Sequence, residues 1–197
     1  MKIIQSALLG TFFATLTMAT PITFTFTTTP VTGTIGATPF SNRVITITAV
    51  GDTSTIVNMG GNPLIPEISI SQASFSISGG VGSGTLTTPG YVYDDQTTTG
   101  KVVYGSGSDL VIVSGSTFLS YALTTSLGQT TSSVLGLTGG LANWSGVGTS
   151  LGSLTVTGAS VDVHNTFAAT TTPEPSTLFL TFGAGLLLLS RIRRPQK

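Results

Sequence analysis

Ile22-Thr23-Phe24-Thr25-Phe26-Thr27 alternates large apolar residues with threonine. Successive side chains of an extended strand point to opposite faces of its sheet, so this stretch has one apolar face and one hydroxyl face. Aromatic and β-branched residues suit a half-buried strand. The stretch therefore predicts a β-strand that turns its rings toward a core and its threonines toward solvent.

The same alternation recurs further along the chain. Ile45–Ala49 repeats it, and Ile68–Ser71 does so until the phase slips by one near Gln72 and resumes over Ala73–Ile77. A slip of one residue in a period-two pattern predicts a β-bulge or bend. Further candidate strands are Tyr91–Tyr93, Lys101–Tyr104, Leu110–Val113, Phe118–Leu123, Leu154–Val156 and Val161–Val163.

Glycine, proline, asparagine and aspartate lie between these segments, which is turn chemistry. Many short strands and no convincing amphipathic helix predict an all-β fold: an antiparallel β-sandwich, jelly-roll or immunoglobulin-like, over residues 20–167. Residues 129–150 are the least regular and predict a long loop, or a short helix around Ser132–Leu137. Residues 168–172 are polar and unpatterned, and predict a linker.

Charged residues are rare, at 7% of the 197 residues, and unevenly placed. Between Thr20 and Thr172 only Arg43 and Lys101 are basic, against six acidic residues, which gives this region a net charge of −4. Such a region cannot neutralise a phosphate backbone, so nucleic acid is not an expected partner. The chain has no cysteine, which excludes disulfides, thiolate nucleophiles and cysteine–zinc sites.

The N-terminal end has the layout of a secretory signal peptide. Met1-Lys2 is positively charged, residues 3–16 are mostly apolar, and Thr17-Met18-Ala19 supplies small residues at a cleavage site. The apolar stretch is shorter than the roughly 20 residues of a membrane span. We therefore expect residues 1–19 to be a signal helix that is removed after Ala19, with export across the inner membrane.

The C-terminal end combines a short motif, an apolar segment and a basic tail. Pro173-Glu174-Pro175 precedes an uncharged stretch over 176–190, and Arg191, Arg193 and Arg194 follow in the tail 191–197. The apolar stretch predicts a short transmembrane helix, and the basic cluster predicts that the tail stays cytoplasmic with everything before Pro173 outside. The two prolines keep the motif extended, as a protease substrate should be.

This order of motif, helix and basic tail over residues 173–197 resembles the PEP-CTERM sorting signal of exported bacterial proteins. The resemblance implies that Pro173, Glu174 and Pro175 are the processing motif of an exosortase, a membrane protease-transferase. It also implies that the helix and tail are removed after export and that the protein reaches the cell surface or extracellular matrix, in association with exopolysaccharide. The resemblance does not extend to the central region.

One pattern suggests catalysis. Gly148-Thr149-Ser150-Leu151-Gly152 matches G-x-S-x-G, and Asp162 and His164 follow in the order of an α/β-hydrolase triad. A nucleophile elbow needs a helix after the serine and a parallel sheet beneath it, whereas Leu154–Thr157 is typical of a strand. A serine hydrolase that uses Ser150 is therefore a remote alternative. No catalytic residue, cofactor or metal ligand is assigned.

Two binding hypotheses remain. The aspartates Asp94 and Asp95, with Asp52 and Asp109 elsewhere, suggest a calcium site, although no dedicated calcium loop is present. Thr-x-Thr segments at Thr23–Thr27, Thr46–Thr48 and Thr155–Thr157 suggest a hydroxyl array that binds a glycan or ice, although no fixed repeat is present. Trp144, beside a tyrosine, is a candidate for stacking on a sugar.

We expect from these observations an exported, membrane-tethered surface or matrix protein with a non-enzymatic structural or adhesive role. Its expected partners are an exosortase, the export machinery, the membrane and exopolysaccharide. The alternative is a glycan- or ice-binding module.

Overall fold

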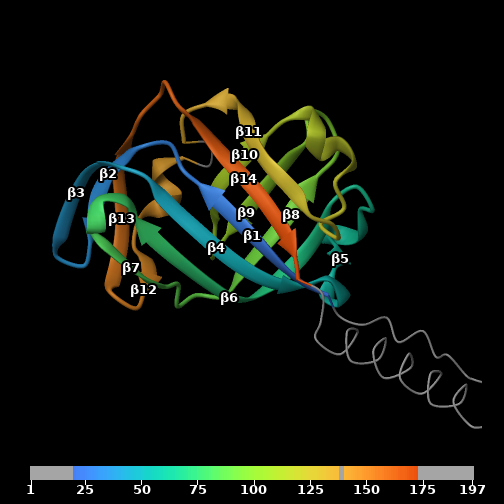
Figure 1. Ribbon diagram of the computed structural model, residues 1–197, viewed down its shortest axis with the longest axis horizontal. Helices are drawn as coiled ribbons and strands as arrows, with labels where there is room; N and C mark the ends of the chain where they lie inside the picture. The colour runs from blue at the N-terminus through green and yellow to red at the C-terminus, as the bar shows by residue number, and fades with distance from the viewer. Residues whose placement is uncertain (1–19, 138–139, 173–197) are drawn as a thin grey trace, which may run out of the picture.

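The computed structural model describes residues 20–137 and 140–172, and these form an all-β protein of antiparallel sheets (Figure 1). The larger sheet has the strand order β10-β9-β8-β6-β4-β1-β14-β11, with β5 and β7 each paired to β6. Its strands are β1 (Pro21–Thr27), β4 (Ile45–Asp52), β5 (Val57–Asn58), β6 (Pro66–Ile77), β7 (Gly82–Thr85), β8 (Gly90–Asp95), β9 (Lys101–Gly105), β10 (Asp109–Ser114), β11 (Leu127–Leu135) and β14 (His164–Thr171).

A smaller sheet has the order β12-β13-β2-β3. It is made of β2 (Val31–Ile35), β3 (Thr38–Arg43), β12 (Val147–Thr149) and β13 (Gly152–Ala159). Single turns of 3₁₀-helix connect the strands: η1 (Thr53–Thr55), η2 (Met59–Gly61), η3 (Ser78–Gly80), η4 (Ser116–Ser120) and η5 (Leu141–Trp144). The apolar residues of both sheets belong to one core, which agrees with a sandwich or a barrel-like fold.

The larger sheet curls around an aromatic interior. Phe26 of β1 lies 5.0 Å from Phe167 of β14 and 5.8 Å from Tyr104 of β9, measured between ring centroids. Phe118 of η4 packs edge-on against Phe167 from the same interior. The ends of the sheet also approach each other, because the amide of Ser114 in β10 donates to Oγ of Ser132 in β11 at 3.2 Å.

The structure confirms the strands expected from alternation at β1, β4, β6, β8, β9, β10 and β13. The phase slip near Gln72 is a bulge within β6. The pairing with β4 moves from Val50↔Gln72 to Gly51↔Ile70, so Ser71 has no partner residue in β4. The bulge lets both halves of β6 keep their apolar side chains inward.

Four expectations were wrong. Phe118–Leu123 is not a strand, because Ser116–Ser120 forms η4 and buries Phe118. Val161–Val163 is an exposed loop in which Val161 is 71% exposed, so its alternation reflects no sheet. Residues 129–150 form neither a long loop nor a helix at Ser132–Leu137, because they include most of β11, which pairs with β14, and also η5 and β12. Residues 168–171 are not a linker but the second half of β14, held by pairing with β1.

The expected signal peptide, cleavage residue, sorting motif, apolar helix and basic tail lie at 1–19 and 173–197, outside the described residues. In the part of the chain that the structure describes, no helix has the length and apolar character needed to span a membrane.

Candidate binding face

Two of the three Thr-x-Thr segments lie side by side on the outer surface of the larger sheet. The register of β1 with β4 places Thr25 opposite Thr48 and Thr27 opposite Thr46. The apolar partners in these strands, such as Phe24 and Ile47, are fully or almost fully buried on the other face. The threonines are therefore brought together by the same alternation that builds the core.

The array extends over the neighbouring strands. Beyond β4, Thr46 and Thr48 lie opposite Ser76 and Ser74 of β6, which in turn lie opposite Ser83 and Thr85 of β7. Beyond β1, Thr27 and Thr23 lie opposite Thr166 and Thr170 of β14. We call this surface the hydroxyl face and define it by Thr23, Thr25, Thr27, Thr46, Thr48, Ser74, Ser76, Ser83, Thr85, Thr166 and Thr170.

The hydroxyls of this face are available for a ligand. Each of these residues is half-buried or exposed, and among the described residues none of their hydroxyl groups has a hydrogen-bond partner in the protein. Strand spacing sets the hydroxyls about 4.8 Å apart across the sheet and about 6.8 Å apart along a strand. The surface thus offers rows of donors and acceptors at fixed intervals.

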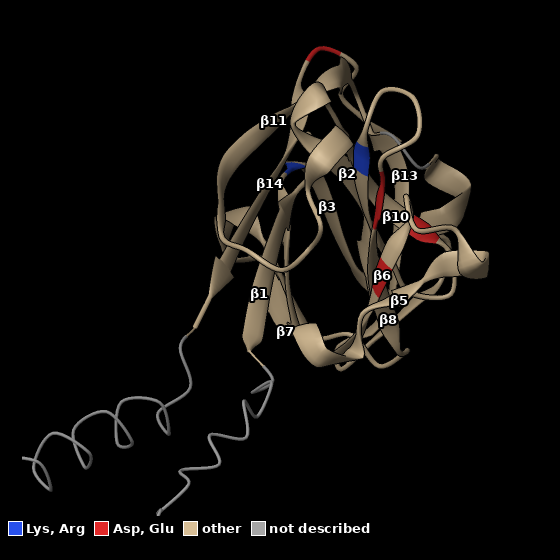
Figure 2. Ribbon diagram, turned by 90° about the vertical axis from the view of Figure 1, so that its right-hand side faces the viewer, with Lys and Arg blue, Asp and Glu red and all other residues tan. Residues whose placement is uncertain are grey.

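None of the residues that define the hydroxyl face is charged, and the ribbon of its central strand β1 is tan throughout in Figure 2. Charged or titratable residues stand only at its edges within the described chain: Asp52 beyond Val50 in β4, His164 before Thr166 in β14, and Arg43, whose guanidinium lies against Gly79 after β6. Val50 and Ala168 are the small apolar members of the central rows. A neutral, hydroxylated ligand therefore matches this surface better than an ionic one.

Two hollows border the hydroxyl face. One of about 220 Å³ lies over Thr25, Thr27 and Thr166, with Gln129 of β11 at its side. The other, of about 270 Å³, lies at the bulge of β6 beside Thr85 and is lined further by Gln72, Thr87 and Thr88. Both hollows combine hydroxyl and amide groups with apolar side chains, namely Phe167 and Ala168 in the first and Ile70 and Leu86 in the second. A chain-like ligand that crosses the face would therefore find a recess of mixed character at each side.

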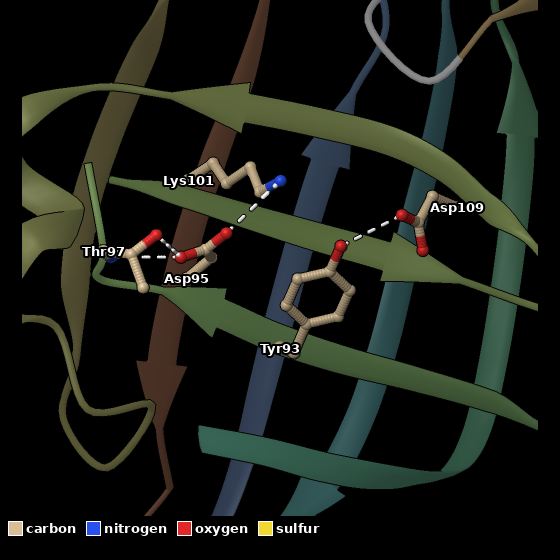
Figure 3. Close-up of polar contacts among 5 residues, drawn as sticks. All are labelled: Tyr93, Asp95, Thr97, Lys101 and Asp109. Carbon is tan, nitrogen blue, oxygen red and sulfur yellow. Dashed lines mark hydrogen bonds and ion pairs between the residues drawn. The ribbon is translucent and has the colours of Figure 1, made fainter. Parts of the chain in front are cut away.

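A second polar cluster lies on β8, β9 and β10, in a separate part of the larger sheet (Figure 3). Tyr91 and Tyr93 stack with ring centroids 6.1 Å apart, and their hydroxyls donate to Oδ1 and Oδ2 of Asp109, each at 2.9 Å. Burial and the carboxylate of Asp109 raise the pKa of Tyr91 to about 12 and raise that of Tyr93 as well. The two tyrosine hydroxyls and the Asp109 carboxylate thus use one another as hydrogen-bond partners. These bonds link β8 to β10 across β9.

Asp94 and Asp95 are adjacent but point to opposite sides of β8. Asp95 forms an ion pair with Lys101 at 3.4 Å and accepts a hydrogen bond from the amide of Thr97 (Figure 3). Asp94 is fully buried, and burial raises the pKa of its carboxyl to about 7. No group of three or more histidine, cysteine or acidic residues suited to a metal occurs among the described residues. The four aspartates of the calcium hypothesis are thus not brought together.

The residues of the hydrolase pattern have separate partners. Ser150 lies in the turn between β12 and β13, where its Oγ accepts a hydrogen bond from the amide of Thr85 at 3.0 Å. Asp162 is exposed in the loop before β14. Nδ1 of His164 lies 3.3 Å from the carbonyl oxygen of Val134. The G-x-S-x-G stretch therefore forms a β-hairpin turn, followed by a strand rather than a helix.

Trp144 is a core residue rather than a sugar platform. It is 1% exposed, and its Nε1 donates to the carbonyl oxygen of Leu110 at 2.7 Å. The third Thr-x-Thr segment, Thr155–Thr157, belongs to β13 in the smaller sheet and is separate from the hydroxyl face.

Sequence reasoning missed the serines of β6 and β7 and the threonines of β14 as members of one surface. Their own alternation was the available signal, but only the strand pairing shows that they adjoin Thr25 and Thr48. Comparison of the chain with protein-family models, with curated proteins and with solved structures found no match.

Proposed function

We propose that this chain is an exported, membrane-tethered surface protein whose hydroxyl face binds a neutral polysaccharide. The observation that carries the proposal is the hydroxyl face itself: an uncharged surface of partner-free hydroxyls across β7, β6, β4, β1 and β14. Polysaccharides are recognised through many neutral hydrogen bonds, each worth about 1 kcal/mol net. The role is adhesive and non-enzymatic, and we propose that the two sheets act as a β-sandwich scaffold for it.

Sheet geometry favours a flexible polymer over an ice crystal. Adjacent strands rotate by roughly 20–25°, so the surface turns by about 80–100° between β7 and β14. A flat lattice would meet only part of such a surface, whereas a polymer chain can follow it. An ice-binding role remains the alternative, and ice-shaping by the purified protein without retention on polysaccharide would favour it.

Retention on immobilised neutral polysaccharides tests the binding proposal. The isosteric double substitution Thr25→Val and Thr48→Val removes two central hydroxyls and should weaken binding about ten-fold or more. The control is Thr155→Val with Thr157→Val in β13. It removes two hydroxyls that bond to the Gly146 amide and the Thr32 carbonyl, and the folded variant should bind like the wild type. Equal binding by both double variants would contradict the assignment of the hydroxyl face.

The export part of the proposal rests on the terminal segments. We propose that residues 1–19 direct export, that 176–190 tether the protein with Arg191, Arg193 and Arg194 on the cytoplasmic side, and that an exosortase processes it at Pro173-Glu174-Pro175. Replacing these three residues with alanine should block processing in a host with an exosortase. Mass spectrometry of the membrane-bound protein should then still find residues 176–197 attached. Thr172→Ala is the control and should be processed normally. Wild-type protein that keeps residues 176–197 in such a host would contradict processing.

A further inference from the structure

The described domain carries exposed apolar side chains at the end from which the C-terminal segment leaves. Val57 is 57% exposed, Met59 is 37% exposed and Leu64 is 48% exposed. All three lie in the hairpin of residues 56–66, which is closed by pairing of Val57 with Glu67 and by a 2.9 Å hydrogen bond from the Met59 amide to the Ile65 carbonyl. We call residues 57–64 the apolar tip.

Both ends of the domain are fixed beside this hairpin (Figure 1). The amide of Thr172 donates to the carbonyl oxygen of Pro21 at 3.0 Å, and the amide of Thr53 donates to the carbonyl oxygen of Thr20 at 3.3 Å. Thr53 begins η1, which runs directly into Ile56 and the hairpin. The apolar tip and the point where residue 173 leaves the domain therefore lie at the same end of the molecule.

The number of residues between the domain and the apolar stretch limits the distance between the Thr172 end of the domain and a membrane. Only residues 173–175 separate Thr172 from the uncharged stretch over 176–190. Four Cα steps in an extended chain span at most about 14 Å. If 176–190 spans the bilayer, this end of the domain is held at the depth of the lipid headgroups.

We propose that the apolar tip rests in the headgroup region of the bilayer while the tether is in place. The inference depends on the membrane tether proposed above and adds a second contact to it. Exposed apolar side chains gain free energy by entering this interface. Because Asp52 and Glu67 flank the hairpin, the partner that fits is a zwitterionic lipid surface rather than an anionic one. In this orientation β1 and β14 extend from the membrane surface toward the solvent. The hydroxyl face is then roughly perpendicular to the membrane plane and accessible to a polymer.

Site-specific fluorescence can test the contact in the full chain. The chain has no cysteine, so Met59→Cys and Val161→Cys each give a unique site for an environment-sensitive dye. Val161 is a stringent control, since it is 71% exposed and lies before the start of β14, at the opposite end of that strand from Thr171. The protein is reconstituted in phosphatidylcholine vesicles that contain a headgroup-labelled quencher, and vesicle flotation is measured on the same samples.

We expect the chain to float with the vesicles, and the dye at position 59 to be blue-shifted and quenched at least three-fold more than the dye at 161. Val57→Ser with Leu64→Ser, in the Met59→Cys background, should reduce the quenching, whereas Val163→Ser should not. Flotation with equal quenching at both positions would overturn this inference and leave the tether intact. Failure to float would overturn the tether and the inference with it.

Discussion

Gln96 donates a 3.2 Å hydrogen bond from Nε2 to Oδ2 of Asp94, while Oδ1 of the same carboxyl is buried without a partner. The same amide nitrogen also donates to the carbonyl oxygen of Tyr121 at 2.8 Å. Burial raises the pKa of Asp94 from 3.8 to about 7, the neighbouring Asp95 adds to the rise, and the Gln96 hydrogen bond partly opposes it. A carboxyl in this setting favours its protonated form.

The free energy of unfolding should therefore fall as the pH rises from about 4 to about 7 and level off above that. The folded state holds the Asp94 proton more tightly than the unfolded state, so the stabilisation is fully present below pH 3.8 and is lost as the pH approaches about 7. The rise of the Asp94 pKa from 3.8 to about 7 corresponds to a loss of at most about 4 kcal/mol in the free energy of unfolding. Urea unfolding at pH 4, 6 and 8 measures this loss for the wild type.

Asp94→Asn should flatten that pH profile and make the protein more stable than the wild type at pH 8, because the amide carries no charge to bury. Asp95→Asn is the control and should shift stability in the opposite direction, since the hydrogen bonds from Thr97 and the ion pair with Lys101 hold the pKa of Asp95 below its usual value. That variant should lose some stability at neutral pH. An Asp94→Asn profile parallel to the wild type would show that Asp94 is not the titrating group.

Gly105 should not tolerate a side chain. A Cβ at this position would overlap the ring of Tyr91, which lies across Gly105 to reach Asp109. We expect Gly105→Ala to lower the free energy of unfolding by about 1–3 kcal/mol. The control is Gly128→Ala in β11, where no atom lies within 4 Å of the added methyl group, and the effect should stay within about 0.5 kcal/mol.

A double-mutant cycle with Tyr91→Ala separates the clash from backbone effects. If the ring causes the penalty, Gly105→Ala should cost much less in the Tyr91→Ala background. An unchanged cost would point to the backbone of β9 instead.

The half-buried strands were predictable because the alternation of apolar and polar residues is visible within each strand alone. Phe24 and Phe26 alternate with threonine whatever the strand pairs with, and the same holds for Ile45 and Ile47 in β4. Phe118 could not be placed this way. It is buried from a 3₁₀ turn with Tyr121 three residues later, and an apolar run of this length fits a strand equally well. The alternation of Val161 and Val163 misled because both side chains are exposed in a loop and neither residue belongs to a described strand.

The hydroxyl face was predictable in its parts but not as a surface. Thr25 and Thr48 lie opposite each other only because β1 pairs with β4 in a particular register, and a shift of one residue would turn the threonines of one strand inward. Thr155 has the same local pattern, but β13 pairs with β2 in the other sheet. Which threonines belong to the hydroxyl face is decided by pairing between strands that are distant in sequence. Alternation within one strand carries no information on that pairing.

The single tryptophan should report on stability but not on ligand binding. Trp144 is 1% exposed, so its emission should be blue-shifted in the folded protein and unchanged when polysaccharide saturates the hydroxyl face. Trp144→Phe leaves the Leu110 carbonyl without its donor, and we expect a loss of about 1–3 kcal/mol in the free energy of unfolding. An emission shift on adding ligand would place the ligand near η5 rather than on the hydroxyl face.

Binding to the hydroxyl face should be insensitive to salt. No charged side chain lies within the face, so its hydrogen bonds to a neutral polymer involve no ion pair to screen. Raising the salt to about 1 M shortens the Debye length to about 3 Å, yet the dissociation constant should change by less than about two-fold. Thr48→Lys supplies the matched contrast, because a cation in the centre of the face should create salt-sensitive binding of an acidic polysaccharide. Wild-type binding that weakens steeply with salt would instead implicate the charged edge residues Arg43 and Asp52.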